Sequence, residues 1–383
     1  MEIRLPASKS ISARALIINA LAEQPCELRN LSDCDDTQAL LHVLHGGSDI
    51  GAAGTAMRFA TALLAATPGA ERTLTGSPRM KERPIGILVD ALRQLGADIE
   101  YTEREGYPPL HIRGKQLTTE HLSQIADGTP VLSLPANISS QYISALLMIA
   151  PTLKQGLTIC LEGTIASRPY IEMTCKLMAE WGIHAEWQTT HTLYIPAHAY
   201  VRTTPYEVEA DWSAASYFLA ARRDVHLPGL QSPSVQGDNV VVKMLQQLDT
   251  LQGTTEVLQL DFAQCPDLAQ TLVVAACMAG RPFCYTGLQS LRIKETDRIA
   301  ALVNECAKLG WTLTEPTPGS LSWHGGEEPL PPTAAPTLAT YKDHRMAMAF
   351  ALCMLRWPHL KFDDPSVVTK SFPNFWQEFR KLL

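Results

Sequence analysis

The 383-residue sequence has no long hydrophobic run, and its longest uninterrupted apolar stretch covers residues 346–355. A membrane-spanning helix needs roughly 18–20 such residues. Positive charge is also scarce, since 32 Lys and Arg stand against 39 Asp and Glu and give a net charge of −7. This balance excludes the general basic excess of proteins that bind nucleic acids or anionic membranes. Any anionic ligand must therefore meet a local basic site.

Other familiar patterns are missing as well. The nine cysteines form no C-x-x-C pair, which argues against a disulfide framework and against a zinc ribbon. The N-terminal MEIRLPASKS resembles neither a signal peptide nor an amphipathic leader, so we expect a cytoplasmic protein. Neither G-x-x-x-x-G-K-[ST] nor G-x-G-x-x-G is present, and nucleotide binding loses its main sequence support.

What is present indicates an α/β chain long enough for two domains, with 46% hydrophobic and 19% charged residues. A helical apolar pattern, a glycine and an alternating run recur around Gly96, Gly182 and Gly310, which predicts repeated helix-to-strand units. A polar stretch near residues 206–211 is the expected domain boundary. The Pro- and Gly-rich segment 316–336 is predicted to be a surface excursion.

Short segments of the first half place cations beside small polar residues at expected helix starts. In ASKSISARAL, Ser8 is predicted to cap a helix that bears Lys9, Ser10 and Arg14, a suitable anion site. The others are GAAGTAMR, RMKERPIG, ISSQYISALL and SRPYIEMT. Each one alone is also compatible with an ordinary capped helix or a solvated charge run.

The second half adds acids among cations. Asp267 precedes an apolar helix in CPDLAQTL, where a helix-capping aspartate is the ordinary interpretation. RIKETDR and DHRMAMAFAL set charged residues against apolar helices, and such charges need partners or a ligand. Lys370 in KSFPNFW is by default a surface lysine.

Taken in order, the segments LPASKS, GTAMR, RMKERPIG, SSQ, SRPYI, QGD, KETDR, DHRMAM and KSFP closely resemble the 5-enolpyruvylshikimate-3-phosphate synthase family, from the N-terminus to Phe372. The resemblance implies the enolpyruvyl transferase fold, an α/β fold of two similar domains built from βαβαββ units. It assigns 9–208 to the first domain, and 1–8 with 209–383 to the second. It also implies transfer of the enolpyruvyl group of phosphoenolpyruvate to the 5-hydroxyl of shikimate 3-phosphate, without a metal or an organic cofactor. The enzyme would be a monomer that acts in aromatic amino acid biosynthesis.

The resemblance also implies site residues. Shikimate 3-phosphate would be bound by Lys9, Ser10, Arg14, Ser139, Ser140, Gln141, Ser167, Tyr170, Asp267 and Lys294. Phosphoenolpyruvate would be bound by Lys9, Gly54, Arg83, Gln141, Arg298, Arg345 and Lys370. The catalytic residues would be Lys9, Asp267 and Glu295. Because these cations come from both halves, we expect the substrates to bind between the domains and to draw them together about a hinge at 206–211.

The sequence departs from the family pattern at several places. Ala52 and Ser290 stand where asparagine is expected, Ala13 where it is common, and Phe59 where proline is usual. The bridge VLHGGSDI is some thirty residues shorter than the family pattern, so one unit of the first domain is expected to be truncated near 43–50. Two alternatives stay open: a UDP-N-acetylglucosamine enolpyruvyl transferase, although its loop cysteine is missing near residues 79–84, and a non-catalytic phosphosugar-binding relative.

Overall fold

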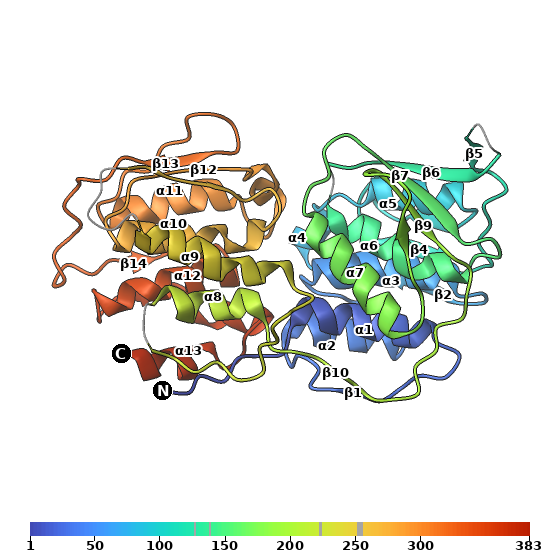
Figure 1. Cartoon of the computed structure of the whole chain (residues 1–383), viewed down its shortest axis with the longest axis horizontal. Helices are drawn as coiled ribbons and strands as arrows, with labels where there is room; N and C mark the ends of the chain where they lie inside the picture. Colours follow the sequence, from blue (N-terminus) through green and yellow to red (C-terminus); the bar gives the residue numbers. More distant parts are fainter. Residues whose placement is uncertain (126–127, 138, 222–223, 251–255) are drawn as a thin grey trace. The chain divides into compact units, whose positions relative to one another are not determined.

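The computed structural model describes residues 1–125, 128–137, 139–221, 224–250 and 256–383. The chain divides into two units, which we call the inserted unit (Ala7–Val208) and the terminal unit (Met1–Pro6 with Glu209–Leu383). Figure 1 colours the inserted unit from blue to green and most of the terminal unit from yellow to red. The terminal unit therefore contains both ends of the chain.

Helices α1, α3, α6 and α7 of the inserted unit pack against one another and are covered by strands. The strands form sheets in the orders β2-β4-β3 and β5-β6-β7-β9-β8, with β1 paired to β10. The helices are α1 (Lys9–Leu21), α2 (Asp35–Leu44), α3 (Gly54–Ala66), α4 (Pro78–Lys81), α5 (Gly86–Gln94), α6 (Ser140–Ile149) and α7 (Arg168–Glu180). The strands are β1 (Leu28–Arg29), β2 (Glu71–Leu74), β3 (Asp98–Tyr101), β4 (Leu110–Arg113), β5 (Ser123–Gln124), β6 (Pro130–Pro135), β7 (Leu157–Glu162), β8 (Glu186–Trp187), β9 (Thr192–Ile195) and β10 (Tyr206–Glu207).

In the terminal unit, α10 packs against α8, α11 and α12, beside sheets in the orders β11-β12-β13 and β14-β15. The α-helices are α8 (Trp212–Ala220), α9 (Val241–Thr250), α10 (Ala269–Met278), α11 (Arg298–Lys308), α12 (His344–Phe350) and α13 (Phe375–Phe379). The short 3-10 turns include η2 (Gly237–Val240), η3 (Pro266–Leu268), η4 (Gln289–Ile293) and η6 (Pro365–Lys370). The strands are β11 (Leu258–Asp261), β12 (Phe283–Thr286), β13 (Leu321–Trp323), β14 (Thr337–Leu338) and β15 (Lys361–Phe362).

The glycines that the sequence pattern selected do end helices. The glycines that follow α5, α7 and α11 are Gly96, Gly182 and Gly310, with φ between 83° and 89°. Residues other than glycine rarely adopt this backbone region. Strands β3 and β8 follow the first two. After Gly310 the expected strand is wrong, because the chain makes an isolated bridge between Thr314 and Ser322 instead.

The predicted surface excursion at 316–336 is also partly wrong. Within it β13 is buried along its whole length and pairs with β12. The apolar residues Leu321 and Trp323 outweigh the surrounding Pro and Gly, because they cover the hydrophobic core of the terminal unit. In the inserted unit, Asp49 of the short connection between α2 and α3 forms an isolated bridge with Thr75, which follows β2.

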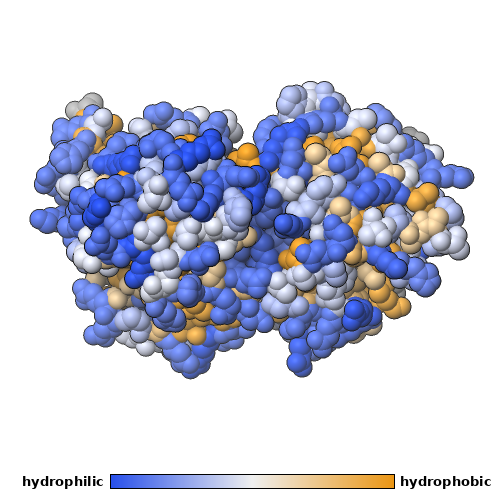
Figure 2. All heavy atoms as spheres, turned by 180° about the vertical axis from the view of Figure 1, so that it is seen from behind, coloured by the Kyte–Doolittle hydropathy of each residue, from blue (hydrophilic) through white to orange (hydrophobic). Residues whose placement is uncertain are grey.

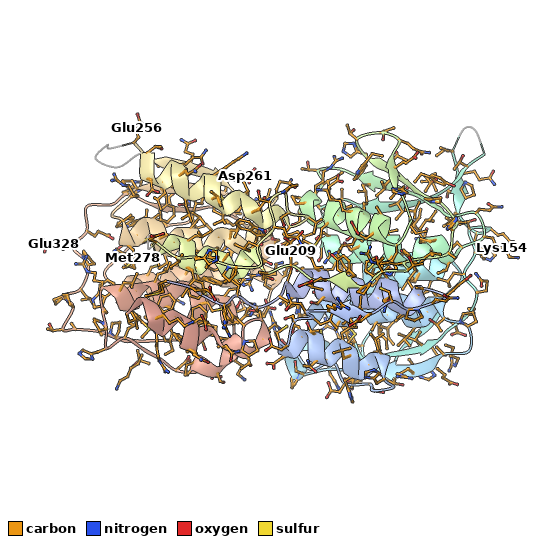
Figure 3. All side chains as sticks on the ribbon, turned by 60° about the horizontal axis from the view of Figure 1, so that its bottom comes forward. Lys154, Glu209, Glu256, Asp261, Met278 and Glu328 are labelled. Carbon is orange, nitrogen blue, oxygen red and sulfur yellow. The ribbon has the colours of Figure 1, made fainter. Side chains whose placement is uncertain are left out.

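Glu209 begins the return of the chain to the terminal unit and is labelled in Figure 3. Its buried carboxylate accepts a hydrogen bond from the Ser234 hydroxyl at 2.7 Å. Hydrophilic residues cover most of the molecular face in Figure 2, with scattered hydrophobic patches. Within the described ranges, no helix is long and apolar enough to span a bilayer.

Candidate active site

The first predicted segment of the inserted unit forms the start of α1. Ser8 is its N-cap and accepts a hydrogen bond from the amide of Ile11, as the sequence predicted. Lys9 and Ser10 follow in the first turn. The Lys9 Nζ atom lies 2.9 Å from Asp36 Oδ2, near the start of α2. The segment thus presents a cation and a hydroxyl at the positive end of a helix dipole.

Arg14 lies one turn further along α1 and is almost completely buried. Its guanidinium donates to Thr174 Oγ1 at 2.7 Å, to Ser144 Oγ at 3.2 Å and to the carbonyl of Ser10 at 2.9 Å. A further bond reaches the carbonyl of Tyr170 at 3.3 Å. Among the described residues no carboxylate lies within ion-pair distance of Arg14, and burial lowers its pKa to about 10. Within the described part of the chain, Arg14 is thus a buried cation held by neutral oxygens and by the Phe59 ring, whose centroid lies 5.3 Å from the guanidinium carbon.

The GTAMR segment begins α3 and lies against Arg83. A Cβ atom added to Gly54 would come within 2.5 Å of Arg83 Nη1, so the guanidinium occupies space that only a glycine leaves free. Arg58 fixes both segments, because it donates to the carbonyls of Gly54 at 3.1 Å and Pro84 at 3.0 Å. Arg83 itself is 9% exposed, and in the described part of the chain its Nε atom has no hydrogen-bond partner.

The SSQ and SRPY segments are the N-termini of α6 and α7. Ser139 caps α6 and accepts from the Gln141 amide at 3.3 Å, and the Gln141 side chain donates to Thr55 of α3 at 3.0 Å. Ser140 follows in α6 and is 8% exposed. Ser167, just before α7, has a left-handed φ of 53°. Together with the contacts of Arg14, these bonds join the N-terminal parts of α1, α3, α6 and α7, where the positive ends of the helix dipoles favour anions.

The predicted residues of the terminal unit form a network of ion pairs around Asp267 and Arg298. Asp267 lies in η3 and accepts from Arg345 at 2.9 Å and from Arg298 at 3.3 Å, with Lys294 Nζ at 4.0 Å. The capping interpretation of Asp267 is wrong, because the N-cap residue of α10 is Leu268. The carboxylate therefore faces three cations.

Arg298 begins α11 and is 1% exposed. It donates to Asp343 at 2.7 Å and to Glu295 at 2.9 Å. Burial acts to lower its pKa, but the charges of Asp343, Glu295 and Asp267 raise the pKa above its usual value. Asp343 also caps α12 by accepting from the Arg345 amide at 2.9 Å. Two charged residues of DHRMAMAFAL therefore have partners within the protein, Asp343 in Arg298 and Arg345 in Asp267.

Lys370, at the end of η6, is not the surface lysine that its position near the chain end suggested. It is 8% exposed, and its Nζ atom lies 3.3 Å from Glu295 Oε1. Glu295 is thus flanked by Lys370 and Arg298.

Several functional neighbours were not identified from the sequence. Asp36 pairs with Lys9, whereas Ser144 and Thr174 hold Arg14. Asp238 belongs to the QGD segment but had no role; it is 4% exposed and accepts a hydrogen bond from Ser213. Small polar residues at helical spacing on apolar helices were the available signal for Ser144 and Thr174. In the described ranges, no group of three His, Cys, Asp or Glu side chains could hold a metal ion.

Comparisons with known proteins agree on one family. The family model of EPSP synthase (3-phosphoshikimate 1-carboxyvinyltransferase) matches residues 1–46 and 47–379. A 3-phosphoshikimate 1-carboxyvinyltransferase of Bacteroides fragilis is 47% identical over 400 residues, covering 99% of this chain and 94% of the relative. One from Neisseria meningitidis is 37% identical over 432 residues, covering 99% and 95%.

Solved structures share the fold. An EPSP synthase from Acinetobacter baumannii superposes with a TM-score of 0.74 at 20% identity, covering 100% of this chain and 96% of that one. The enolpyruvyl transferase NikO from Streptomyces tendae gives 0.67 at 13% identity, covering 100% and 94%. The expected enolpyruvyl transferase fold is confirmed.

Proposed function

The chain belongs to the EPSP synthase family, and from that premise we propose how its residues perform the family's reaction. The protein is an enolpyruvyl transferase of the shikimate pathway. It transfers the enolpyruvyl group of phosphoenolpyruvate to the 5-hydroxyl of shikimate 3-phosphate and releases phosphate.

Residues of the inserted unit bind shikimate 3-phosphate: Ser10, Arg14, Ser139, Ser140, Gln141, Ser167 and Tyr170, with Lys9 beside them. The observation that carries this assignment is the buried Arg14, which has hydroxyl and carbonyl partners but no acidic one among the described residues. A buried cation without an acid favours an anionic ligand. The joined helix N-termini add partial positive charge for the same ligand. Asp267 and Lys294 complete this set from the terminal unit.

Phosphoenolpyruvate is bound mainly by the cations of the terminal unit: Arg298, Arg345 and Lys370. Lys9, Gly54, Arg83 and Gln141 of the inserted unit contribute as well. Guanidinium groups match the paired oxygens of carboxylate and phosphate. Because Arg345 and Lys370 already pair with Asp267 and Glu295, substrate binding must share these cations with the two acids.

The two acids perform the proton transfers. Asp267 orients the 5-hydroxyl and takes its proton as the oxygen bonds to C2 of phosphoenolpyruvate, while Glu295 gives a proton to C3. In the second step the C2–O bond to phosphate breaks and Glu295 takes a proton back from C3. Lys9 assists the departing phosphate. Asp267 therefore begins ionised and Glu295 begins protonated, and the proton that Asp267 gains leaves with the departing phosphate.

Phosphate release tests the function directly. The wild-type protein with both substrates should release phosphate, and omission of either substrate should abolish release. In deuterated water, solvent deuterium should appear at C3 of the product, because the transient methyl group exchanges hydrogens. Release with UDP-N-acetylglucosamine in place of shikimate 3-phosphate would favour the sister transferase, and binding of shikimate 3-phosphate without release would favour the non-catalytic alternative.

Three further properties remain predictions. Activity should survive prior treatment with a chelator, since the proposed steps need no metal or cofactor. Sedimentation should give the mass of a monomer, 42.0 kDa. Cell fractionation should place the protein in the cytoplasm.

A further inference from the structure

Asp238 carries a buried carboxyl group that the proposed reaction does not use. It lies in η2 and accepts a hydrogen bond from the hydroxyl of Ser213, in the first turn of α8. Helix α8 packs against both η2 and η3, the turn that carries Asp267. One helix therefore holds the segments of both carboxyl groups.

The charged surroundings of Asp238 come from several elements. Burial raises its pKa to about 6, and the negative charge of Asp267 adds to the increase. Asp211, the N-cap of α8, acts in the same direction, whereas Ser213 and Arg345 of α12 oppose it. The neighbouring Cys265 thiol has its pKa raised to about 12 by burial, then by Asp238. Asp238 and Asp267 therefore sense each other's charge, and that coupling acts equally in both directions.

This coupling matters because of what surrounds Asp267. Its carboxylate accepts from Arg345 and Arg298, with Lys294 at 4.0 Å. Nearby cations stabilise an ionised carboxylate and make it a weaker base. A carboxylate that must take a proton from a hydroxyl needs a nearby negative charge to offset these cations. The charge of Asp238 supplies one from within the protein.

We infer that Asp238 is a positioning residue for the proton transfer: its buried carboxylate, held by Ser213 on α8, opposes the cations around Asp267 and keeps Asp267 able to accept the proton of the substrate hydroxyl. The inference rests on the proposed function, since that function gives Asp267 its proton. Asp238 itself need not touch either substrate.

The test compares pH profiles of kcat/KM between pH 5 and 9 in Asp238→Asn and wild type. Loss of the charge should move the acid limb down by about 1 pH unit and lower the plateau roughly 3- to 10-fold, because Asp267 becomes a weaker base. The substrate phosphates titrate near pH 6, but they do so equally for every variant. A lowered plateau with an unmoved acid limb would indicate a structural role and overturn the inference.

Two other variants keep the test decisive. Ser213→Ala removes a donor that favours the charged form of Asp238. The charged form, on which the faster reaction depends, then appears only at higher pH. The acid limb of this variant should therefore move to higher pH, opposite to that of Asp238→Asn. Glu305→Gln changes another carboxyl that is fully buried in the same unit and should leave the limb in place. If Asp238→Asn does not fold, an unmoved limb in Ser213→Ala overturns the inference by itself.

A measurement without turnover separates this inference from the proposed function. In protein labelled with 13C at the aspartate carboxyl groups, the Asp238 signal, identified by its loss in Asp238→Asn, should titrate near pH 6. Its pKa should fall in Asp267→Asn. An unchanged Asp238 titration in Asp267→Asn would refute the coupling, whereas wild-type protein that releases no phosphate would refute the function and leave the titration result standing.

Discussion

Arg14 and Arg298 are both almost completely buried, yet the two units satisfy them in opposite ways. In the inserted unit Arg14 is held by hydroxyl and carbonyl oxygens, and burial lowers its pKa to about 10. In the terminal unit Arg298 pairs with Asp343, Glu295 and Asp267, and its pKa rises despite burial.

The difference separates two ways of preparing for an anion. A buried cation without an acidic partner is energetically unfavourable, and a bound anion reduces that cost. A cation among carboxylates is already neutralised, so an incoming anion must share it with them. In the proposed mechanism the acids of the terminal unit also transfer protons, and this role requires them to lie beside the cations. Removing partners from the arginine of either unit should therefore give different losses.

The largest effect on turnover is expected when an acid of the terminal network is replaced by an amide of the same shape, which cannot transfer a proton. Glu295→Gln should lower kcat by about 10²- to 10⁴-fold, while the affinity for shikimate 3-phosphate stays unchanged. Steady-state phosphate release and equilibrium binding measure the two. Normal turnover with normal deuterium incorporation at C3 would move the proton transfer to Lys9 or Asp267.

Removing a buried partner should cost the terminal unit more stability than the inserted unit. Asp343→Asn keeps a capping side chain but removes the charge opposite Arg298, and should cost about 3–5 kcal/mol of unfolding free energy. Thr174→Val removes one neutral acceptor from Arg14 and should cost about 1–3 kcal/mol. Urea denaturation measures both. Equal costs would mean that the carboxylates contribute no more than the hydroxyls.

Within the terminal network the planar guanidinium should matter beyond its charge. Arg298→Lys should cost about 1.5–3 kcal/mol in transition-state stabilisation. The loss should appear in kcat/KM for phosphoenolpyruvate more than in the binding of shikimate 3-phosphate. Unchanged efficiency with phosphoenolpyruvate would remove Arg298 from that site.

The smallest effect is expected at Gly54. Gly54→Ala brings a methyl group against the Arg83 guanidinium, and the arginine must shift at a cost of about 1 kcal/mol. We expect KM for phosphoenolpyruvate to rise roughly fivefold, with shikimate 3-phosphate affinity as the internal control. A drop in both affinities would indicate that α3 itself has moved.

Local signals in the sequence predicted the helix starts well. Ser8 and Ser139 cap helices in the structure as expected, because capping depends on hydrogen bonds within a few residues. Gly96 and Gly182 end helices for the same local reason. The order of short motifs identified the family, which no single motif did.

Partners distant in sequence could not be predicted in this way. Thr174 meets Arg14 across 160 residues and Asp343 meets Arg298 across 45, so only the packing of helices brings them together. Lys370 looked like a surface residue because nothing near it in sequence reveals Glu295. Leu321 to Trp323 looked like loop because Pro and Gly surround a strand whose burial depends on β12.

The route of the chain has a consequence for synthesis on the ribosome. The amide of Asp211 donates to the carbonyl of Pro6 at 3.0 Å, so the chain leaves the terminal unit and returns to it at one point. The amide of Arg4 donates to the carboxylate of Glu378, in α13, at 2.8 Å. The inserted unit is continuous and can finish folding while translation proceeds. The terminal unit, whose first residues emerge earliest, must wait for the last helix, so a nascent chain stalled before Phe375 should hold one folded unit and one unfinished one.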